Sequence, residues 1–251
     1  MMRTLHTFFR KAFPLLFWLA VWLIAYRAVG RDLLLASPLQ VAQRFAFVGQ
    51  ATFWRCVGMS LWRTAAAYVL GVAIACVLAV ACHACRLLDD VVRPAMAVVR
   101  ATPVASFIIL ALVWLSASNV PIFAGLLMVT PVVFANVREG MLATDPQLLE
   151  MAHLFGWSRW KTFRNVTVPS VSSTFWAACE ACVGLCFKAT IAAEVIGTPK
   201  NAIGTQLYNA KIYLETDTLM AWTLTVILLS MLLERLLRWA IERGMRRGHR
   251  A

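Results

Sequence analysis

Long apolar runs separated by short charged stretches dominate this sequence. Each run holds roughly 17–25 residues, which as a helix rising about 1.5 Å per residue crosses a hydrocarbon core about 30 Å thick. The pattern therefore predicts an all-α polytopic membrane protein that forms a single domain over residues 1–251. We place six transmembrane helices at about residues 12–29, 62–85, 97–117, 121–137, 170–193 and 218–239.

The first run follows a basic N-terminus and has the outline of a secretory signal peptide. No small-x-small cleavage site follows it, and Tyr26-Arg27 stands where one is expected, so we predict an uncleaved helix. Residues 30–61 show only weak helical periodicity, with Ser37 as a predicted N-cap and Pro38 in the first turn. We expect this stretch to be an amphipathic segment at or near the outer interface of the membrane.

Small residues and prolines distinguish three of the predicted spans. The second span is rich in Ala and Gly, which lets membrane helices approach closely, so we expect it to be packed against its neighbours and not lipid-facing all round. Arg86–Arg93 is read as a charged break between the second and third spans. Pro103 and Pro131 fall inside the third and fourth spans, where breaks often lie near a transport path, although simple kinks are as common.

A polar, basic segment over residues 138–168 interrupts the apolar pattern. Asp145-Pro146 predicts a helix start, with Asp as the cap and Pro in the first turn. We predict one helix over Gln147–Phe155, a sharp turn at Gly156, and a second, basic helix over Arg159–Asn165. The first helix has an apolar face that fits either a partner protein or the membrane surface, and periodicity alone does not separate the two.

The composition is 61% hydrophobic and only 14% charged, against about 25% charged residues in soluble domains. The net charge of +12 is explained better by basic loops beside membrane spans than by nucleic-acid binding, because no basic stripe with interleaved aromatics lies elsewhere. Sixteen of the 24 Lys and Arg residues fall on one side of the six-span arrangement, which predicts that both termini and the 138–168 segment are cytoplasmic. These residues are Arg3, Arg10, Lys11, Arg86, Arg93, Arg100, Arg138, Arg159, Lys161, Arg164, Arg235, Arg238, Arg243, Arg246, Arg247 and Arg250.

Metal-binding and catalytic signatures are weak in this sequence. Cys82-His-Ala-Cys85 is a CxxC pair, but most of the seven cysteines lie in apolar runs, where they are expected to pack as small hydrophobic residues. The odd number argues against a disulfide framework. No His-Glu-x-x-His, no Gly-x-Ser-x-Gly and no Gly-x4-Gly-Lys-Ser/Thr phosphate loop occurs, so we predict no enzyme, metal site or cofactor in this chain.

Several motifs, in order, carry a family resemblance. Within the 138–168 segment and its end, Glu150, Ala152, Gly156 and Pro169 have the spacing Glu-x-Ala-x3-Gly-x12-Pro. The others are Ser37-Pro38, Ser60-Leu-Trp-Arg63, Arg100-Ala-Thr-Pro103, Ala193-Glu194 and Ala202-Ile203-Gly204. With these motifs, the chain from about Ser37 to Trp239 resembles the permease subunits of ATP-binding-cassette (ABC) importers of the nitrate/sulfonate/taurine type.

The resemblance implies a type I importer permease fold in the bacterial inner membrane, with the 138–168 segment as the "EAA" coupling loop. ATP and Mg²⁺ would then bind two copies of a separate ATPase, beside a second permease copy and an extracytoplasmic solute-binding protein that delivers a small polar solute. The coupling residues it implies are Glu150, Met151, Ala152, Gly156, Trp157 and Pro169. Two positions depart from the pattern: Met151 replaces the first Ala of the triplet, and Ser173 replaces a proline, which predicts a straighter fifth helix.

Glu180 and Lys188 are the candidates for the translocation path, because ionisable groups within a membrane helix usually face a cavity or a partner. They are separated by about 12 Å of rise and about 80° of rotation, too far for a direct pair. The family often has Arg where Glu180 stands, which makes Glu180 the best candidate for contacting a solute; the alternatives are that Glu180 pairs with an arginine elsewhere in the bundle or is protonated. Lys188 would otherwise snorkel to the interface. A stand-alone secondary transporter or channel is the alternative function, although the internal repeats expected of one are not found.

Overall fold

The computed structural model describes the backbone of residues 2–248 and the side chains of residues 13, 14 and 16–243. Within this range the chain is helical and contains no strand. The α-helices are α1 (Met2–Val29), α2 (Pro38–Arg44), α3 (Ala51–Ala84), α4 (Arg86–Ala101), α5 (Val104–Ala111), α6 (Val120–Leu142), α7 (Pro146–Leu154), α8 (Arg159–Thr162), α9 (Val168–Gly197), α10 (Ile203–Ile212) and α11 (Thr216–Gly248). A 3₁₀ turn, η1 (Phe45–Gly49), and a π-helical turn, η2 (Phe163–Thr167), complete the chain.

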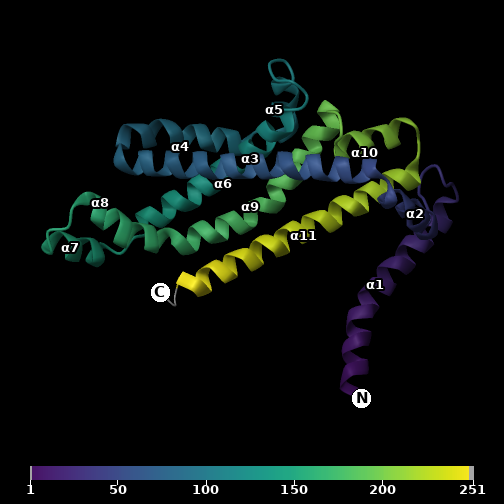
Figure 1. The fold of residues 1–251 in the computed structure, drawn as a ribbon, viewed down its shortest axis with the longest axis horizontal. Helices are drawn as coiled ribbons and strands as arrows, with labels where there is room; N and C mark the ends of the chain where they lie inside the picture. The colour runs from purple at the N-terminus through teal and green to yellow at the C-terminus, as the bar shows by residue number, and fades with distance from the viewer. Residues whose placement is uncertain (1, 249–251) are drawn as a thin grey trace.

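Four long helices, α3, α6, α9 and α11, run along the longest axis of the molecule (Figure 1). The short helices α7 and α8 lie at one end of it, which we name the α7 end. Helices α2 and α10 lie at the other, the α10 end (Figure 1). Helix α1 extends away from the bundle and contacts it near Trp22, whose indole N–H donates to the carbonyl of Ala36 at 3.0 Å.

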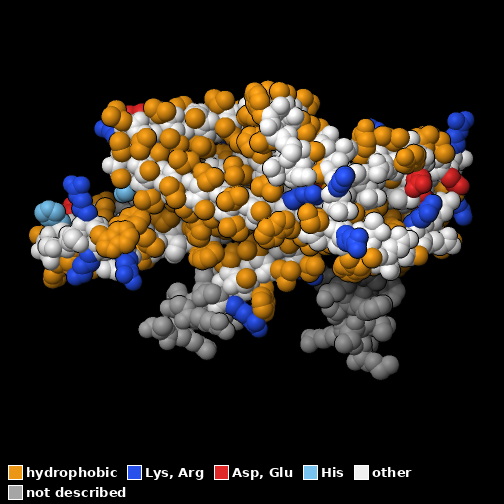
Figure 2. Space-filling view, turned by 45° about the horizontal axis from the view of Figure 1, so that its top comes forward, with side chains coloured by type: hydrophobic (Ala, Val, Ile, Leu, Met, Phe, Trp, Pro, Cys, Tyr) orange, Lys and Arg blue, Asp and Glu red, His pale blue; other side chains and the backbone are white. Residues whose placement is uncertain are grey.

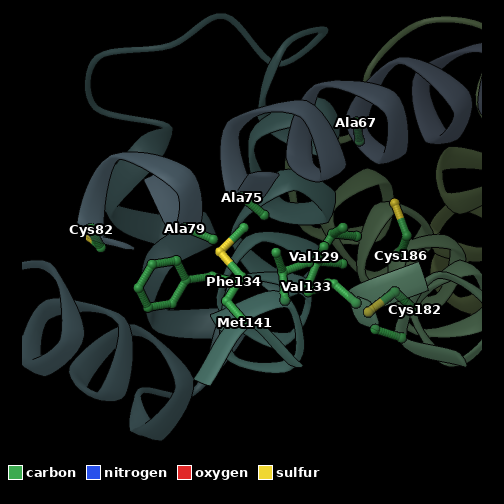
Figure 3. Packing of buried hydrophobic residues seen from close by; sticks show 13 residues of the cluster. Ala67, Ala75, Ala79, Cys82, Val129, Val133, Phe134, Met141, Cys182 and Cys186 are labelled. Carbon is green, nitrogen blue, oxygen red and sulfur yellow. The ribbon is translucent and has the colours of Figure 1, made fainter. Parts of the chain in front are cut away.

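The core lies where α3, α6 and α9 meet, and Figure 3 shows its side chains pointing toward one another. Small residues bring these helices close: a Cβ added to Gly71 of α3 would stand 2.9 Å from Cβ of Val129 on α6. The prediction that the second span is packed by its small residues is therefore confirmed. The labelled core residues are Ala67, Ala75, Ala79, Cys82, Val129, Val133, Phe134, Met141, Cys182 and Cys186.

Residues 97–117, expected to form one continuous span, are broken. Helix α4 begins at Arg86, inside the stretch read as a charged break, turns back along α3 and ends at Ala101. After Thr102-Pro103, α5 leaves at 99° to α4, because proline disfavours a helical conformation at the residue before it. Arg100 therefore lies about 21 Å of helix rise from Arg86. The count of basic residues in the sequence grouped Arg100 with those of the α7 end, and the structure separates it from them.

The other predicted spans correspond to single helices with different ends. Helix α3 begins at residue 51 instead of 62, and α6, α9 and α11 extend past the predicted 137, 193 and 239. The stretch 194–217, between the fifth and sixth predicted spans, contains α10. The capping of α2 is confirmed. Ser37 Oγ accepts from the backbone N–H of Gln40, and Oε1 of Gln40 accepts from the backbone N–H of Ser37.

By length and composition, three of the described helices are able to cross a membrane: Ala51–Ala84, Val120–Leu142 and the Thr216–Arg243 part of α11. The bent pair α4 and α5 would add a fourth. Helix α9, which carries Glu180, Lys188 and Glu194, is outside this group, and the apolar part of α1 is the shorter Leu16–Val29. The count of six spans stays a prediction.

Candidate functional site

The 138–168 segment forms the α7 end, and its first helix has a well-defined start and stop. The carboxylate of Asp145 accepts from the backbone N–H of Gln147 at 2.9 Å, so the predicted cap of α7 is confirmed. Helix α7 ends in a Schellman motif, in which Gly156 has a φ of +64° and Trp157 N–H donates to the carbonyl of Ala152 at 3.0 Å. The sharp turn predicted at Gly156 is therefore present.

The second helix of the segment is continuous with α9. Helix α8 starts at Ser158, whose hydroxyl accepts from the N–H of Lys161, and passes through the π-helical turn η2 directly into α9. Pro169, in the first turn of α9, has no N–H to donate, which the wide turn just before it accommodates. Helix α8, η2 and α9 thus form one unbroken helical path, so a displacement of α8 is transmitted directly to α9.

The α7 end exposes large apolar side chains among basic ones. Leu154 is 86% exposed, Phe155 72% and Trp160 70%, whereas Ala152 is fully buried. Figure 2 shows Lys, Arg and His side chains gathered around hydrophobic ones at this end. Lys161 also lies over the ring of Trp157 at 4.6 Å, which holds that indole against α8.

The expected coupling residues therefore separate into two groups. Glu150 and Met151 are exposed on α7 beside Leu154 and Phe155, while Ala152, Gly156 and Trp157 shape the end of the helix. Leu154, Phe155 and Trp160 were not among the coupling residues predicted from the sequence. Their only signal in the sequence is that large apolar residues recur within a segment too polar to lie in the membrane.

The two candidates for the translocation path lie in different surroundings. Glu180 accepts from Nη2 and Nε of Arg238 on α11, at 2.6 and 2.7 Å, so it takes part in an ion pair between α9 and α11. Lys188 is exposed and forms no ion pair with any other described side chain. It lies on the exposed stripe of α9, whose other members are Ala177, Ala181, Leu185 and Ile196.

A buried polar network ties α3, α9 and α10 together near the α10 end. We name Ser60, Arg63, Glu194, Ile203 and Gly204 the Arg63–Glu194 network. Nη1 of Arg63 lies 3.0 Å from one carboxylate oxygen of Glu194, and the two side chains are only 4% and 0% exposed. The other carboxylate oxygen accepts from the hydroxyl of Ser60 at 2.7 Å and from the N–H of Gly204 at 3.2 Å. The Ser60 hydroxyl in turn accepts from the N–H of Ile203 at 3.0 Å.

A cavity of about 400 Å³ opens beside this network at the α10 end, with Phe47, Phe53 and Trp222 on its wall. At its rim Arg44 donates to Asp217 at 2.6 Å, and this hydrogen bond raises the pKa of the Arg44 guanidinium above its ordinary value. No group of His, Cys, Asp and Glu side chains suited to a metal ion occurs among the described residues, and the seven cysteines are free thiols.

Membrane-length helices packed through small residues, with a polar segment of short helices projecting from one end, define a multi-pass membrane protein. The family described as binding-protein-dependent transport system inner membrane component matches residues 67–247 of it. The chain belongs to this family, and it is the permease component of an ABC importer, in which a separate subunit hydrolyses ATP.

The relatives carry matching names. A probable ABC transporter permease protein of Brucella melitensis is 25% identical over 185 residues, which cover 73% of this chain and 75% of that protein. A permease of Escherichia coli K12, named for the transport of aliphatic sulfonates, is 26% identical, with 88% of each chain covered. A crystal structure of an amino acid ABC transporter with histidines matches with a TM-score of 0.65 and 19% identity over 76% of this chain and 94% of that one, which shows the shared fold.

Proposed function

We propose that this chain acts as one of two identical permease copies in an importer of the nitrate/sulfonate/taurine type, with the 138–168 segment as its coupling loop to the ATPase. The observation that carries the proposal is the exposed apolar surface of Leu154, Phe155 and Trp160 on a segment joined to α9 without a break. Large apolar side chains on a surface outside the bilayer mark a protein interface.

The coupling is mechanical in this proposal. Two ATPase copies bind ATP and Mg²⁺, and their closure draws the α7 ends of the two permeases together. Glu150, Met151, Leu154 and Phe155 contact the ATPase, while Ala152, Gly156 and Trp157 keep α7 at a fixed angle to α8. Pro169 and η2 pass the movement to α9. A solute-binding protein delivers the solute at the α10 end.

The orientation follows from charge. Arg159, Lys161 and Arg164 crowd the α7 end, so we place this end and both chain termini on the cytoplasmic side of the bacterial inner membrane. Moving Arg100 out of this group leaves the asymmetry intact. The side chains of Arg3, Arg10, Lys11, Arg246 and Arg247, which the sequence count included, lie outside the described ones, as do residues 1 and 249–251 with Arg250.

Lys188 is the better of the two candidates for the translocation path. A cation within a membrane helix that has no ion-pair partner among the described side chains requires water, solute or a second copy beside it. Ala177 and Ala181 on the same exposed stripe of α9 are small side chains that leave room toward one side of it. Glu180, paired with Arg238, is assigned instead to the contact between α9 and α11, the alternative that the sequence analysis left open.

Co-purification tests the coupling role. Tagged permease is extracted in mild detergent from cells that express the whole transporter, and bound ATPase is quantified by mass spectrometry. Phe155→Asp is expected to lower ATPase recovery at least about tenfold, because a buried unpaired carboxylate is costly at an interface. The matched control is Tyr213→Asp, which places the same charge on a 73% exposed aromatic at the α10 end. Equal recovery with both variants, or a permease that transports without any ATPase, would reject the proposal.

A further inference from the structure

We propose that the Arg63–Glu194 network holds α10 and the α9–α10 turn rigidly against α3, so that the α10 ends of these three helices move as one body during transport. This inference rests on the proposed function for its setting, the transport cycle. The network itself consists of contacts within one chain, so its capping role can be measured in the permease without the ATPase.

Burial makes the network hard to open. Separating α3 from α9 would leave Arg63 and Glu194 as two unpaired charges in an apolar bundle, and breaking a buried pair costs far more than the pair gains by forming. Each oxygen of the carboxylate already has a hydrogen-bond donor, from Arg63 on one and from Ser60 and Gly204 on the other. An alternative arrangement would therefore have to replace three donors to one buried carboxylate.

Helix α10 depends on the network for its N-terminal cap. Its own N-cap position is Ala202, which has no side-chain acceptor for the free backbone N–H groups of the first turn. Two of these groups are bonded from outside the helix: Ile203 N–H to Ser60 of α3, and Gly204 N–H to Glu194 of α9. The carboxylate at this terminus also matches the helix dipole. Helix α10 is thus capped by α3 and α9 and cannot leave them without losing its cap.

The turn between α9 and α10 is strained and is held by the same arginine. Thr198 and Asn201 have φ values of 44° and 52°, a region that residues with a side chain rarely adopt and that is least favourable for a β-branched threonine. Such conformations persist where the surroundings fix them. Arg63 supplies this restraint by donating to the carbonyls of Lys200 at 3.1 Å and Asn201 at 3.5 Å.

Close packing removes the remaining freedom between α9 and α10. A Cβ on Gly204 would stand 2.4 Å from Cβ of Glu194 and 2.5 Å from the backbone nitrogen of Val195. Helix α11 also packs against α9 near the α10 end, where Trp222 shares a buried apolar cluster with Phe187 and Ile191. Farther along, the two helices are linked by the partly exposed pair Glu180–Arg238, whose partners separate readily. The movement of the transport cycle is accordingly expected at this farther part of the contact between α9 and α11, with α3, α9 and α10 kept together.

A reversible lock tests whether the three helices stay together. Gln206 of α10 approaches Cys56 of α3, with Nε2 at 3.8 Å from Sγ, so Gln206→Cys creates a thiol pair that a short bis-methanethiosulfonate reagent bridges. Permease and ATPase are reconstituted in nanodiscs, and ATP hydrolysis is measured with the bridge formed and again after reduction. We expect the bridged complex to keep its rate within about twofold, since the lock joins parts that already move together. Gln206→Ser with the same reagent is the control for reaction at the native cysteines.

A second lock gives the contrast. Glu180→Cys with Arg238→Cys, bridged in the same way, joins α9 to α11 and is expected to stop hydrolysis until the bridge is reduced. A bridge between Cys56 and position 206 that blocks hydrolysis, with recovery on reduction, would overturn the proposal, because α3 and α10 would then have to separate.

Hydrogen exchange tests the network in the permease alone, without any ATPase. Glu194→Gln is expected to speed exchange of the amides of residues 203–206 at least about tenfold, while Glu180→Gln leaves them unchanged. Unchanged exchange in Glu194→Gln would overturn the capping role. A permease that recovers no ATPase but shows the expected exchange would refute only the proposed function.

Discussion

Replacing Gly204 by Ala is the most direct test of the packing between α9 and α10. The added methyl group would lie 2.4–2.6 Å from three atoms, Cβ and C of Glu194 and N of Val195, where ordinary contacts are 3.4–4 Å. Two of these are backbone atoms, so the helices must move apart by about 1 Å. Overpacking of this kind costs about 1–3 kcal/mol.

The same movement lengthens the hydrogen bond from Gly204 N–H to Glu194, now 3.2 Å, beyond useful range. A hydrogen bond to a charged group contributes about 1.5–3 kcal/mol, so the total loss is about 2.5–6 kcal/mol. For a chain of this size about 2–4 °C is lost per kcal/mol, which predicts a fall in Tm of about 10 °C.

A thiol-reactive fluorogenic dye provides the assay, because Cys82, Cys179, Cys182 and Cys186 are buried and react only after unfolding, whereas Cys56 lines the open cavity at the α10 end, where a small reagent reaches it. The matched control is Gly58→Ala, inside α3 about two turns from its N-terminus, where an added Cβ meets nothing within 4 Å. It is expected to leave Tm unchanged or to raise it slightly, since Ala is favoured over Gly in a helix by about 1 kcal/mol. A Gly204→Ala variant within about 2 °C of the unmodified protein would refute the packing argument.

Three further substitutions have smaller expected effects. Gly156→Ala is expected to cost about 1–2 kcal/mol through its positive φ alone, because the site is open, and to lower ATPase co-purification less than Phe155→Asp does. Glu180→Gln is expected to change Tm by no more than the equivalent of about 1 kcal/mol and to leave transport unchanged; a loss of transport at unchanged stability would return Glu180 to the translocation path. Asp89→Asn removes a two-pronged, half-buried contact with Arg138, and a loss of about 1–3 kcal/mol is expected in the same dye assay.

Hydrophobic runs predicted the helical class and the approximate places of α3, α6, α9 and α11, but not where the helices begin. Residues 51–61 belong to α3 although Arg55 and Gly58 interrupt the apolar run, because Phe53, Cys56, Val57 and Ser60 share one buried face. Membrane-span reasoning weighs average hydropathy, and this part of α3 is stabilised by a single packed face.

The 138–168 segment was predicted more fully than the interior. Its signals are local: a cap at Asp145, a glycine at the end of α7 and a polar composition, all within a few residues of each other. The Arg63–Glu194 pair joins positions 131 residues apart. The sequence motifs containing Ser60, Arg63, Glu194 and Gly204 were each identified, yet nothing in one sequence shows that they meet in space.

The same limit explains why the sequence alone did not distinguish between the two candidates for the translocation path. An acidic residue within an apolar helix signals a partner or a cavity, and only the fold shows that Arg238 lies opposite Glu180. Lys188 has no such counterpart among the described side chains. The break after α4 has a local cause in Pro103, but its 99° bend reflects the packing of α5 against α6 and α9.

The π-helical turn at residues 163–167 gives the helix that leads into α9 one residue of spare length. A π turn contains about one residue more than an α turn, so it completes the same rotation with an extra residue. Deleting one residue within Phe163–Thr167 would therefore restore a regular helix and leave Phe155 facing nearly the same direction. Deleting one residue from the regular helix of α9 would instead rotate everything before it by about 100°, so the direction of the α7 end depends on where in this path a residue is lost.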